Sequence, residues 1–175
     1  MMKTVPRHLM LAVVAAALVA RSAVAQTEIP KDFSPVTAAF DHERREVMIP
    51  MRDGVKLRAV VVIPKGATAA PIILSRTPYG SKKPTTQSSS PHAAMVLQLD
   101  DEPLLEAGYI RVYQDVRGRF DSEGDYVMTL PLRGALNRRK VDQATDTWDT
   151  IEWLLTNVEG NNGRVGLAGV SYGGW

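Results

Sequence analysis

The feature that most restricts the fold of this chain is a five-residue segment at positions 169–173, which reads Gly-Val-Ser-Tyr-Gly. A serine between two glycines at this spacing is typical of a sharp turn that joins a strand to a helix. The turn strains the serine backbone, and the flanking glycines avoid clashes where strand and helix approach each other. A helical pattern, an Asn-Gly turn and a short apolar run precede it in the required order. The segment therefore predicts an α/β fold around Ser171.

The rest of the chain predicts a hairpin followed by strands that alternate with helices. Asp53 and Gly54 lie between two strand-like runs and favour the positive φ of a tight turn. A lead-in over residues 26–45 is expected to be irregular. The later strands are expected to be parallel, which makes this an α/β sheet. The predicted strands are residues 47–51, 57–63, 71–77, 109–113 and 164–168.

The end of a helix is predicted at residues 104–107, before Gly108, and the clearest helix over residues 142–157. Ala144, Trp148, Ile151 and Leu155 recur at helical spacing, so we expect them to form its apolar face. Acidic residues occupy the other positions and suit the positive end of the helix dipole. The chain then turns at residues 161–163 before the last predicted strand.

The first 25 residues predict a secretory signal peptide. Lys3 and Arg7 give it a charged start, an apolar run follows over residues 9–20, and an Ala-Val-Ala sequence ends at Ala25. The apolar run is shorter than the roughly 20 residues that span a bilayer. We therefore expect a secreted or periplasmic protein that is cleaved after Ala25 and has no membrane partner afterwards.

Composition restricts the partners of the mature chain. Lys and Arg number 21 and Asp and Glu 19, for a formal net charge of +2. Three of the basic residues and none of the acidic ones lie in the predicted signal peptide, so the remainder is close to neutral. A near-neutral chain has no basic footprint for nucleic acid. The sequence has no cysteine and no cluster with metal-ligand spacing, so we expect neither a metal nor a cofactor.

Ser171 is the candidate nucleophile for acyl transfer, because the turn exposes its hydroxyl at the start of a helix. Such a site also needs two donors to the oxyanion. The first candidate is the backbone N–H of Tyr172, the residue after the serine. The second usually comes from the loop after the third strand, which here contains Tyr79. Tyr79 either donates its phenolic hydroxyl or only packs at the strand end, and its position leaves both roles open.

Several segments of the chain occur in the same order in one group of proteins. They are Arg-Thr-Pro-Tyr at 76–79, Gln-Asp-Val-Arg-Gly at 114–118, Ser-Glu-Gly at 122–124 and the segment at 169–173. On these residues the chain resembles the cocaine-esterase-like and Xaa-Pro dipeptidyl-peptidase-like serine hydrolases. It is similar in particular to the α-amino acid ester hydrolases (β-lactam acylases), through residues 51–55, 124–128 and 146–150.

The resemblance covers residues 45–174 and implies an α/β-hydrolase fold with Ser171 as the nucleophile. It further implies that the hydroxyl of Tyr79 and the N–H of Tyr172 form the oxyanion hole. Asp115 and Arg117 match a family loop for which we expect a structural role. One position departs from the ester hydrolases, because they carry an acidic residue directly after the tyrosine of the elbow and this chain has glycine. The likeness to the wider family is therefore closer than the likeness to this subgroup.

The general base of such an enzyme is not identified in this chain. In this fold a carboxylate and then a histidine follow the nucleophile, and only four residues follow Ser171. His8, His42 and His92 all precede the serine, and we expect the last two to be solvated loop residues. We therefore expect residues 26–175 to be the N-terminal portion of a hydrolase domain that is inactive by itself. The helical cap and the C-terminal β-sandwich domain that the family implies would be absent.

These observations predict a serine hydrolase that works through an acyl-enzyme. The resemblance implies α-amino acid esters or amides, including β-lactam side chains, as substrates. An Xaa-Pro dipeptidyl-peptidase and an aromatic esterase are the alternatives within the family. The alternative from another class is a non-catalytic secreted α/β protein whose elbow serves only the fold. The expected partner is a small ester, an amide or a short peptide. The sequence does not predict whether the full-length protein forms a homo-oligomer.

Overall fold

The computed structural model describes residues 41–86, 88, 90 and 92–174. The predicted signal peptide and residues 26–40 of the predicted lead-in lie outside the described residues. The irregular lead-in ends earlier than expected, since strand β1 already starts at His42. Within the described part of the chain, no helix is long and apolar enough to cross a membrane.

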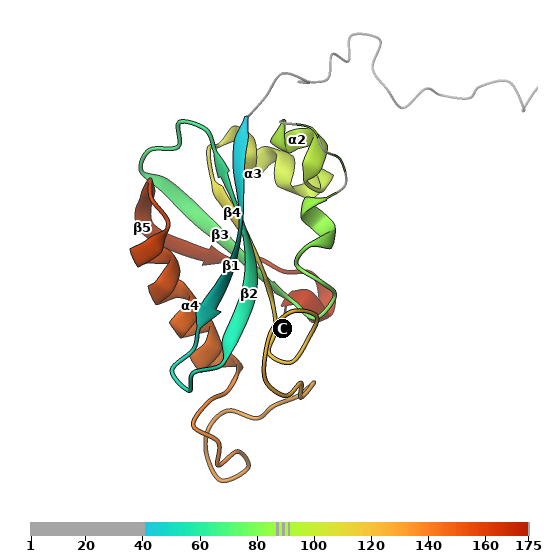
Figure 1. Cartoon of the computed structure of the whole chain (residues 1–175), viewed down its shortest axis with the longest axis vertical. Helices are drawn as coiled ribbons and strands as arrows, with labels where there is room; N and C mark the ends of the chain where they lie inside the picture. The colour runs from blue at the N-terminus through green and yellow to red at the C-terminus, as the bar shows by residue number, and fades with distance from the viewer. Residues whose placement is uncertain (1–40, 87, 89, 91, 175) are drawn as a thin grey trace, which may run out of the picture. The chain divides into compact units, whose positions relative to one another are not determined.

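The described residues form a five-stranded mixed sheet with the order β1-β2-β4-β3-β5 (Figure 1). β2 pairs antiparallel with β1 and with β4, whereas β3 runs parallel to both β4 and β5. This arrangement confirms the α/β class and the order of a hairpin followed by parallel strands. The strands are β1 (His42–Pro50), β2 (Lys56–Pro64), β3 (Ala70–Thr77), β4 (Ile110–Asp115) and β5 (Asn161–Leu167).

The hairpin between β1 and β2 forms where the Asp-Gly sequence predicts it. Gly54 has a φ of +88°, in the left-handed region that glycine adopts without a steric penalty. Its N–H donates to the carbonyl oxygen of Met51 at 2.9 Å and closes the turn. Pro50 and Lys56 are the first pair of the antiparallel register, so the turn fixes which residues of the two strands face each other.

Helices cover both faces of the sheet (Figure 1). Helix α4 (Gln143–Asn157) packs on one face, and the shorter α2 (Ala93–Val96) and α3 (Glu102–Glu106) pack on the other. The remaining helical elements of the described residues are short 3-10 turns: η2 (Lys83–Thr85), η3 (Leu99–Asp101) and η4 (Ser171–Gly174).

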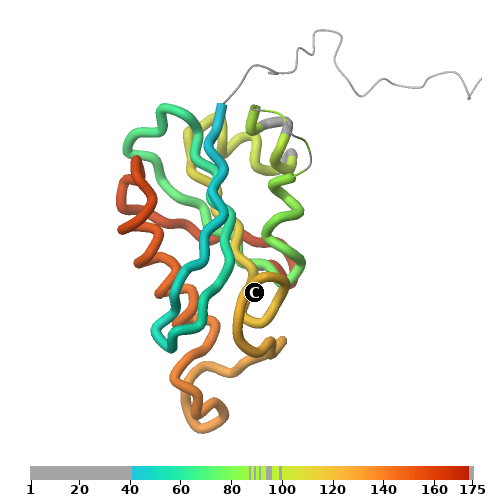
Figure 2. Tube along the Cα trace, in the orientation of Figure 1, coloured from blue at the N-terminus to red at the C-terminus, as the bar shows by residue number. Residues whose placement is uncertain are grey.

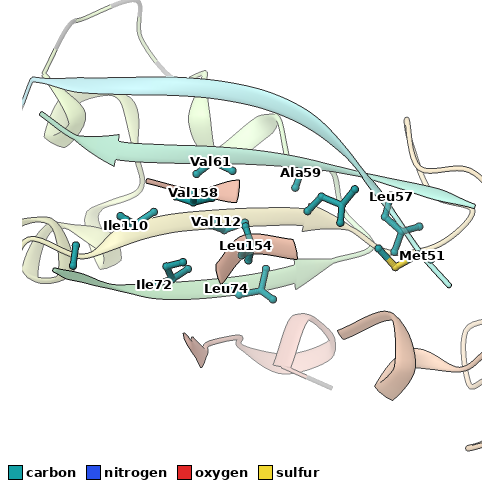
Figure 3. Packing of buried hydrophobic residues seen from close by; sticks show 12 residues of the cluster. Met51, Leu57, Ala59, Val61, Ile72, Leu74, Ile110, Val112, Leu154 and Val158 are labelled. Atoms are coloured by element: carbon teal, nitrogen blue, oxygen red, sulfur yellow. The ribbon is translucent and has the colours of Figure 1, made fainter. Parts of the chain in front are cut away.

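The two faces of the sheet carry separate apolar clusters, because successive side chains of a strand point to opposite sides. On the α4 side, Val61 of β2 belongs to one buried cluster with Ile72 and Val112 of the parallel strands (Figure 3). On the other side, its neighbour Val60 belongs to a second cluster with Leu105 of α3. Burial on both faces, which the sequence predicted for β3, is found in β2 and β4 instead, whereas β3 alternates between buried and half-buried residues.

Helix α4 starts at a reciprocal capping box. The carboxylate of Asp142 accepts a hydrogen bond from the N–H of Thr145 at 2.7 Å. The side-chain oxygen of Thr145 accepts one in return from the N–H of Asp142 at 2.8 Å. Two N–H groups that the first helical turn leaves unpaired are satisfied in this way. The helix lies where the sequence predicts it.

The buried face of α4 differs from the predicted one. Ala144 is exposed and Trp148 is 62% exposed, although both were expected on the apolar face. Asp146, Thr150 and Leu154 are buried instead. The prediction was right for Ile151, which packs against the buried cluster, and wrong for Ala144 and Trp148. It assigned acidic residues to solvent, whereas the carboxylate of Asp146 and the hydroxyl of Thr150 have polar partners beneath the helix.

Strand β5 includes the residues that were expected to form a turn. It starts at Asn161, three residues before the predicted start, and Gly163 within it has a φ of +78°. The pairing of β3 with β5 is irregular between Ala70 and Ile72. The bend predicted from the Asn-Gly sequence therefore exists, but it lies inside the strand and does not precede it.

Candidate active site

Ser171 follows the carboxyl end of β5 and is the first residue of η4. Its φ is +56°, a left-handed conformation that residues other than glycine rarely adopt. The N–H of Gly173 donates to the carbonyl oxygen of Val170 at 3.1 Å and closes the turn around the serine. Ser171 is exposed. The strained, exposed turn that the sequence predicts is therefore present at this position.

Gly173 is not required by close packing in the way the sequence suggested. A Cβ built on Gly173 meets no atom of the described residues within 4 Å. A side chain at this position would therefore not clash with the surrounding described chain. The strain of the turn lies at Ser171 itself and not at the glycine after it.

Contacts with β3 hold the chain just before Ser171. The N–H of Ala168 donates to the carbonyl oxygen of Leu74 at 3.0 Å, and the Ser75 hydroxyl donates to the carbonyl oxygen of Ala168 at 2.8 Å. The parallel strands β4, β3 and β5 end at the same edge of the sheet. Sites in parallel sheets form outside these carboxyl ends, which is where Ser171 lies.

Tyr79 lies at the same edge, in the loop that follows β3. It is 62% exposed, which leaves open both of its expected roles, as an oxyanion donor or as a residue that only packs at the strand end. Its ring meets the ring of Tyr172 edge to face, with centroids 6.3 Å apart and an interplanar angle of 72°. The fold thus brings both predicted oxyanion residues together beside Ser171, although 93 positions of sequence separate the tyrosines.

The loop after β4 holds the Tyr79 loop in place. The backbone N–H and the hydroxyl of Ser81 both donate to the carboxylate of Asp115, the hydroxyl at 3.0 Å. The N–H of Val116 donates to the carbonyl oxygen of Thr77 at 3.1 Å. Asp115 is fully buried, so these contacts are shielded from water. They agree with the structural role that we expected for this residue.

Two opposing effects act on the charge of Asp115. Burial raises the pKa of the carboxyl group, while the hydrogen bonds from Ser81 and the positive charge of Arg58 lower it. The guanidinium Nη1 of Arg58 lies 3.7 Å from the carboxylate. The net direction is a raised pKa, because the group is withdrawn from water.

Arg117 joins three parts of the fold. Its guanidinium donates to Asp146 of α4 at 2.6 Å and to Asp53 of the β1–β2 hairpin at 2.8 Å. Burial disfavours the charge, but the bonds to the two carboxylates outweigh this effect and raise the pKa of Arg117. The structure therefore ties Arg117 to distant segments that sequence reasoning did not connect with it.

Arg76, near the end of β3, also bonds to α4, as Arg117 does. Its guanidinium donates to the side-chain oxygen of Gln114 at 2.8 Å and to the hydroxyl of Thr147 at 2.7 Å. Burial lowers the pKa of Arg76 to about 10, against the opposing effect of Asp146. The arginine thereby fixes the start of α4 relative to the strand ends.

Hydrogen bonds anchor the side chain of Tyr172 to the segment that follows β4. Figure 2 shows the course of that segment along the Cα trace. Its hydroxyl donates to the carbonyl oxygen of Met128 at 2.8 Å and lies 2.8 Å from the hydroxyl of Tyr126. A cavity of about 30 Å³ adjoins these residues and Arg76. Tyr126 precedes Tyr172 by 46 positions, so no local spacing in the sequence reveals the pair.

Both described histidines lie at the opposite edge of the sheet from Ser171. His42 is the first residue of β1, opposite Pro64, and His92 pairs with Asp41 in an isolated bridge. His42 is half-buried in a strand and not in the expected solvated loop, whereas His92 lies in the loop before α2 with its side chain 39% exposed. His8 lies outside the described residues. Within the described ranges, no group of three His, Cys, Asp or Glu residues is arranged to hold a metal ion.

Comparison with known proteins identifies relatives that are hydrolases. The model of the X-Pro dipeptidyl-peptidase (S15) family matches residues 53–175. Cocaine esterase from Rhodococcus sp. (strain MB1 Bresler) is 34% identical over 126 residues. That alignment covers 72% of this chain and 19% of the esterase, so the chain spans about a fifth of the length of that relative.

Solved structures give the same result. An α-amino acid ester hydrolase labelled with selenomethionine matches with a TM-score of 0.74 and 55% identity, over 87% of this chain and 24% of that chain. An aminopeptidase from a marine sediment archaeon (Thaumarchaeota archaeon) matches with a TM-score of 0.73 and 49% identity, over 83% and 24%. The likeness confirms the α/β-hydrolase-type fold. With the sheet, the elbow and the matched range in agreement, the chain belongs to the X-Pro dipeptidyl-peptidase (S15) family of hydrolases.

Proposed function

We propose that the protein that carries this chain is a serine hydrolase in which Ser171 is the nucleophile. The observation that carries the proposal is the strained turn: Ser171, at a φ of +56°, is exposed at the carboxyl edge of the parallel strands, beside Tyr79 and Tyr172. A hydroxyl presented in this way can approach a substrate carbonyl without obstruction from its own strand.

The proposed reaction has two steps. The Ser171 oxygen attacks an ester or amide carbonyl carbon and gives its proton to a histidine base, which neither described histidine provides. The Tyr79 hydroxyl and the Tyr172 N–H donate hydrogen bonds to the oxyanion as it forms. The alcohol or amine then leaves with a proton. Water hydrolyses the acyl-enzyme, which releases the acid and restores the serine.

We propose α-amino acid esters or amides, including β-lactam side-chain amides, as the substrate class. The identity of 55% with an α-amino acid ester hydrolase supports this choice. The aminopeptidase at 49% identity supports short peptides as a second candidate, and the match to the X-Pro dipeptidyl-peptidase family adds Xaa-Pro peptides to it. The more distant cocaine esterase gives weaker support for aromatic esters. In all three substrate classes Ser171 would attack a carbonyl carbon.

The proposal is tested on the product of the complete reading frame. The wild-type protein and Ser171→Ala are compared on an α-amino acid ester, an Xaa-Pro anilide and an aryl ester. We expect Ser171→Ala to lose turnover by several orders of magnitude while its circular dichroism spectrum is unchanged. Labelling with a fluorophosphonate, in which the serine oxygen displaces fluoride, should add the mass of the phosphonyl group at Ser171 only. Turnover that survives Ser171→Ala would refute the proposal and favour the non-catalytic alternative for this elbow.

Export is a separate proposal. We propose that the first 25 residues direct the protein to the periplasm or the exterior, and that cleavage after Ala25 leaves Gln26 as the first residue. The mass of the mature N-terminal peptide, isolated from the secreting host, tests the cleavage site. A mature protein that still begins at Met1 would contradict it.

A further inference from the structure

The two hydrogen bonds at the Tyr172 hydroxyl have a fixed direction. A phenol has one proton, and the carbonyl oxygen of Met128 can only accept, so Tyr172 gives its proton to Met128 at 2.8 Å. The Tyr126 hydroxyl, 2.8 Å away, must then be the donor to the Tyr172 oxygen. Partial burial, together with the neighbouring phenols of Tyr126 and Tyr79, raises the pKa of Tyr172 to about 12. The arrangement therefore stays protonated at physiological pH.

Tyr126 is itself held rigidly by the loop after β4. Gly118 has a φ of +68°, and a Cβ at this position would lie 2.1 Å from the backbone nitrogen of Tyr126. Only glycine allows this approach of the two backbone segments. The guanidinium carbon of Arg119 lies 5.1 Å from the centroid of the Tyr126 ring, and its Nε donates to the carbonyl oxygen of Pro78 at 3.1 Å. One loop thus contacts both Tyr126 and the residue before Tyr79.

We propose that Tyr126 is a positioning residue of the oxyanion hole, which holds Tyr172 so that its backbone N–H points at the developing oxyanion. This inference rests on the proposed function of Ser171 and Tyr172. Tyr126 touches neither substrate nor oxyanion and acts only through Tyr172. The hydrogen bond from Tyr126 and the bond to Met128 anchor the far end of the Tyr172 side chain, while η4 holds its backbone.

The physical reason is the narrow range of an oxyanion hydrogen bond. The donor must lie about 2.7–3.1 Å from the oxyanion, and losing one such donor slows catalysis by about 10²–10³-fold. The N–H of Tyr172 belongs to a turn of four residues that starts with a strained serine. A short turn of this kind has few backbone bonds of its own, so side-chain anchors decide how well its N–H is aligned.

The test is Tyr126→Phe in the product of the complete reading frame, with Tyr109→Phe as the matched control. Tyr109 directly precedes β4, at the edge of the sheet opposite the site. We expect Tyr126→Phe to lower kcat about 10-fold, less than the loss of a whole donor, with KM within about two-fold of wild type. Tyr109→Phe should leave both constants unchanged. Titration with a fluorophosphonate normalises kcat to the fraction of folded sites.

A second measurement separates alignment from a general loss of structure. An aldehyde analogue that forms a tetrahedral adduct with Ser171 needs the oxyanion hole, whereas the acid product does not. We expect Tyr126→Phe to weaken the aldehyde in proportion to its loss in kcat/KM and to leave product binding unchanged. Tyr172→Phe, which keeps the backbone N–H, should have a similar effect, and the double variant should be no slower than either single one.

The outcomes are distinguishable from failure of the proposed function. If Ser171→Ala abolishes turnover but Tyr126→Phe has wild-type kcat, the positioning role is wrong and the nucleophile stands. Equal weakening of aldehyde and product would also overturn the positioning role. If Tyr126→Phe does not fold, Tyr172→Phe tests the same hydrogen bond, and wild-type kcat in that variant rejects the inference. Turnover that survives Ser171→Ala removes the proposed function itself.

Discussion

At the scale of single residues, backbone strain and buried polar contacts hold the candidate site. Ser171 has a positive φ, and Tyr79 is fixed by the loop around Ser81. The buried carboxylate of Asp115 accepts both hydrogen bonds of that serine. Removing one partner of a buried hydrogen bond costs more free energy than the bond contributes. The other polar group stays buried and can bond neither to its partner nor to water.

Asp115→Asn tests this contact. The amide keeps the size of the carboxylate but replaces one acceptor oxygen with a donor, which then faces a Ser81 donor or the Arg58 guanidinium. We expect a loss of about 1–3 kcal/mol in the free energy of unfolding, measured by urea denaturation. Asp125→Asn, at an exposed position of the same loop, is the control and should change little. Equal stability of the two variants would mean that the buried contact contributes nothing.

At the scale of elements, α4 shows which part of an amphipathic pattern the sequence can predict. Its limits were predicted correctly, since Asp142 caps the first turn and the helix ends at Asn157. Its orientation was not. The stripe through Asp146, Thr150 and Leu154 faces the sheet, because the first two side chains have polar partners there. The partner of Thr150 is the buried amide of Gln114 on β4, which no helical periodicity reveals.

Leu154→Ala and Trp148→Ala distinguish the observed face from the predicted one. Leu154 is completely buried between α4 and the sheet (Figure 3), so its truncation should cost about 2–5 kcal/mol in unfolding free energy. Trp148 is 62% exposed and should cost no more than about 0.5 kcal/mol, although its side chain is larger. Guanidinium denaturation of both variants measures the difference. The reverse order would restore the face predicted from the sequence.

At the scale of the whole molecule, a network of buried charges connects segments that are far apart in the sequence. Arg117 bridges Asp53 of the hairpin and Asp146 of α4, and it belongs to the loop that carries Tyr126. Folding must therefore bring the hairpin, α4 and the loop after β4 together at one guanidinium group. Such a buried ion pair is weak evidence of net stability, but removing one partner leaves a charge buried and unpaired.

Arg117→Ala therefore should lower the free energy of unfolding by about 3–5 kcal/mol, because Asp146 is 1% exposed and would lose its main counter-charge. Arg138→Ala, in the exposed part of the loop before α4, is the matched control and should be close to neutral. Thermal and chemical unfolding of both variants measure the effect. A loss below about 1 kcal/mol for Arg117→Ala would show that Arg76 and solvent compensate for it.

The sequence by itself determined the features that depend on neighbouring residues. The Asp-Gly hairpin, the apolar strands, the limits of α4 and the turn at Ser171 follow from local backbone preferences and periodicity. Tyr79 was identified as a candidate from its place after the third strand, and the structure adds that it is exposed and lies beside Tyr172.

Contacts between distant segments could be read from the fold but not from the sequence. The fold determined which face of α4 is buried, how Arg117 joins the hairpin to the helix, and that Tyr126 contacts Tyr172 from 46 positions away. Each of these depends on polar groups that are buried because the fold supplies a partner. The sequence shows whether a residue is polar. Whether a polar residue is buried depends on whether the fold places a hydrogen-bond or charge partner from a distant segment next to it.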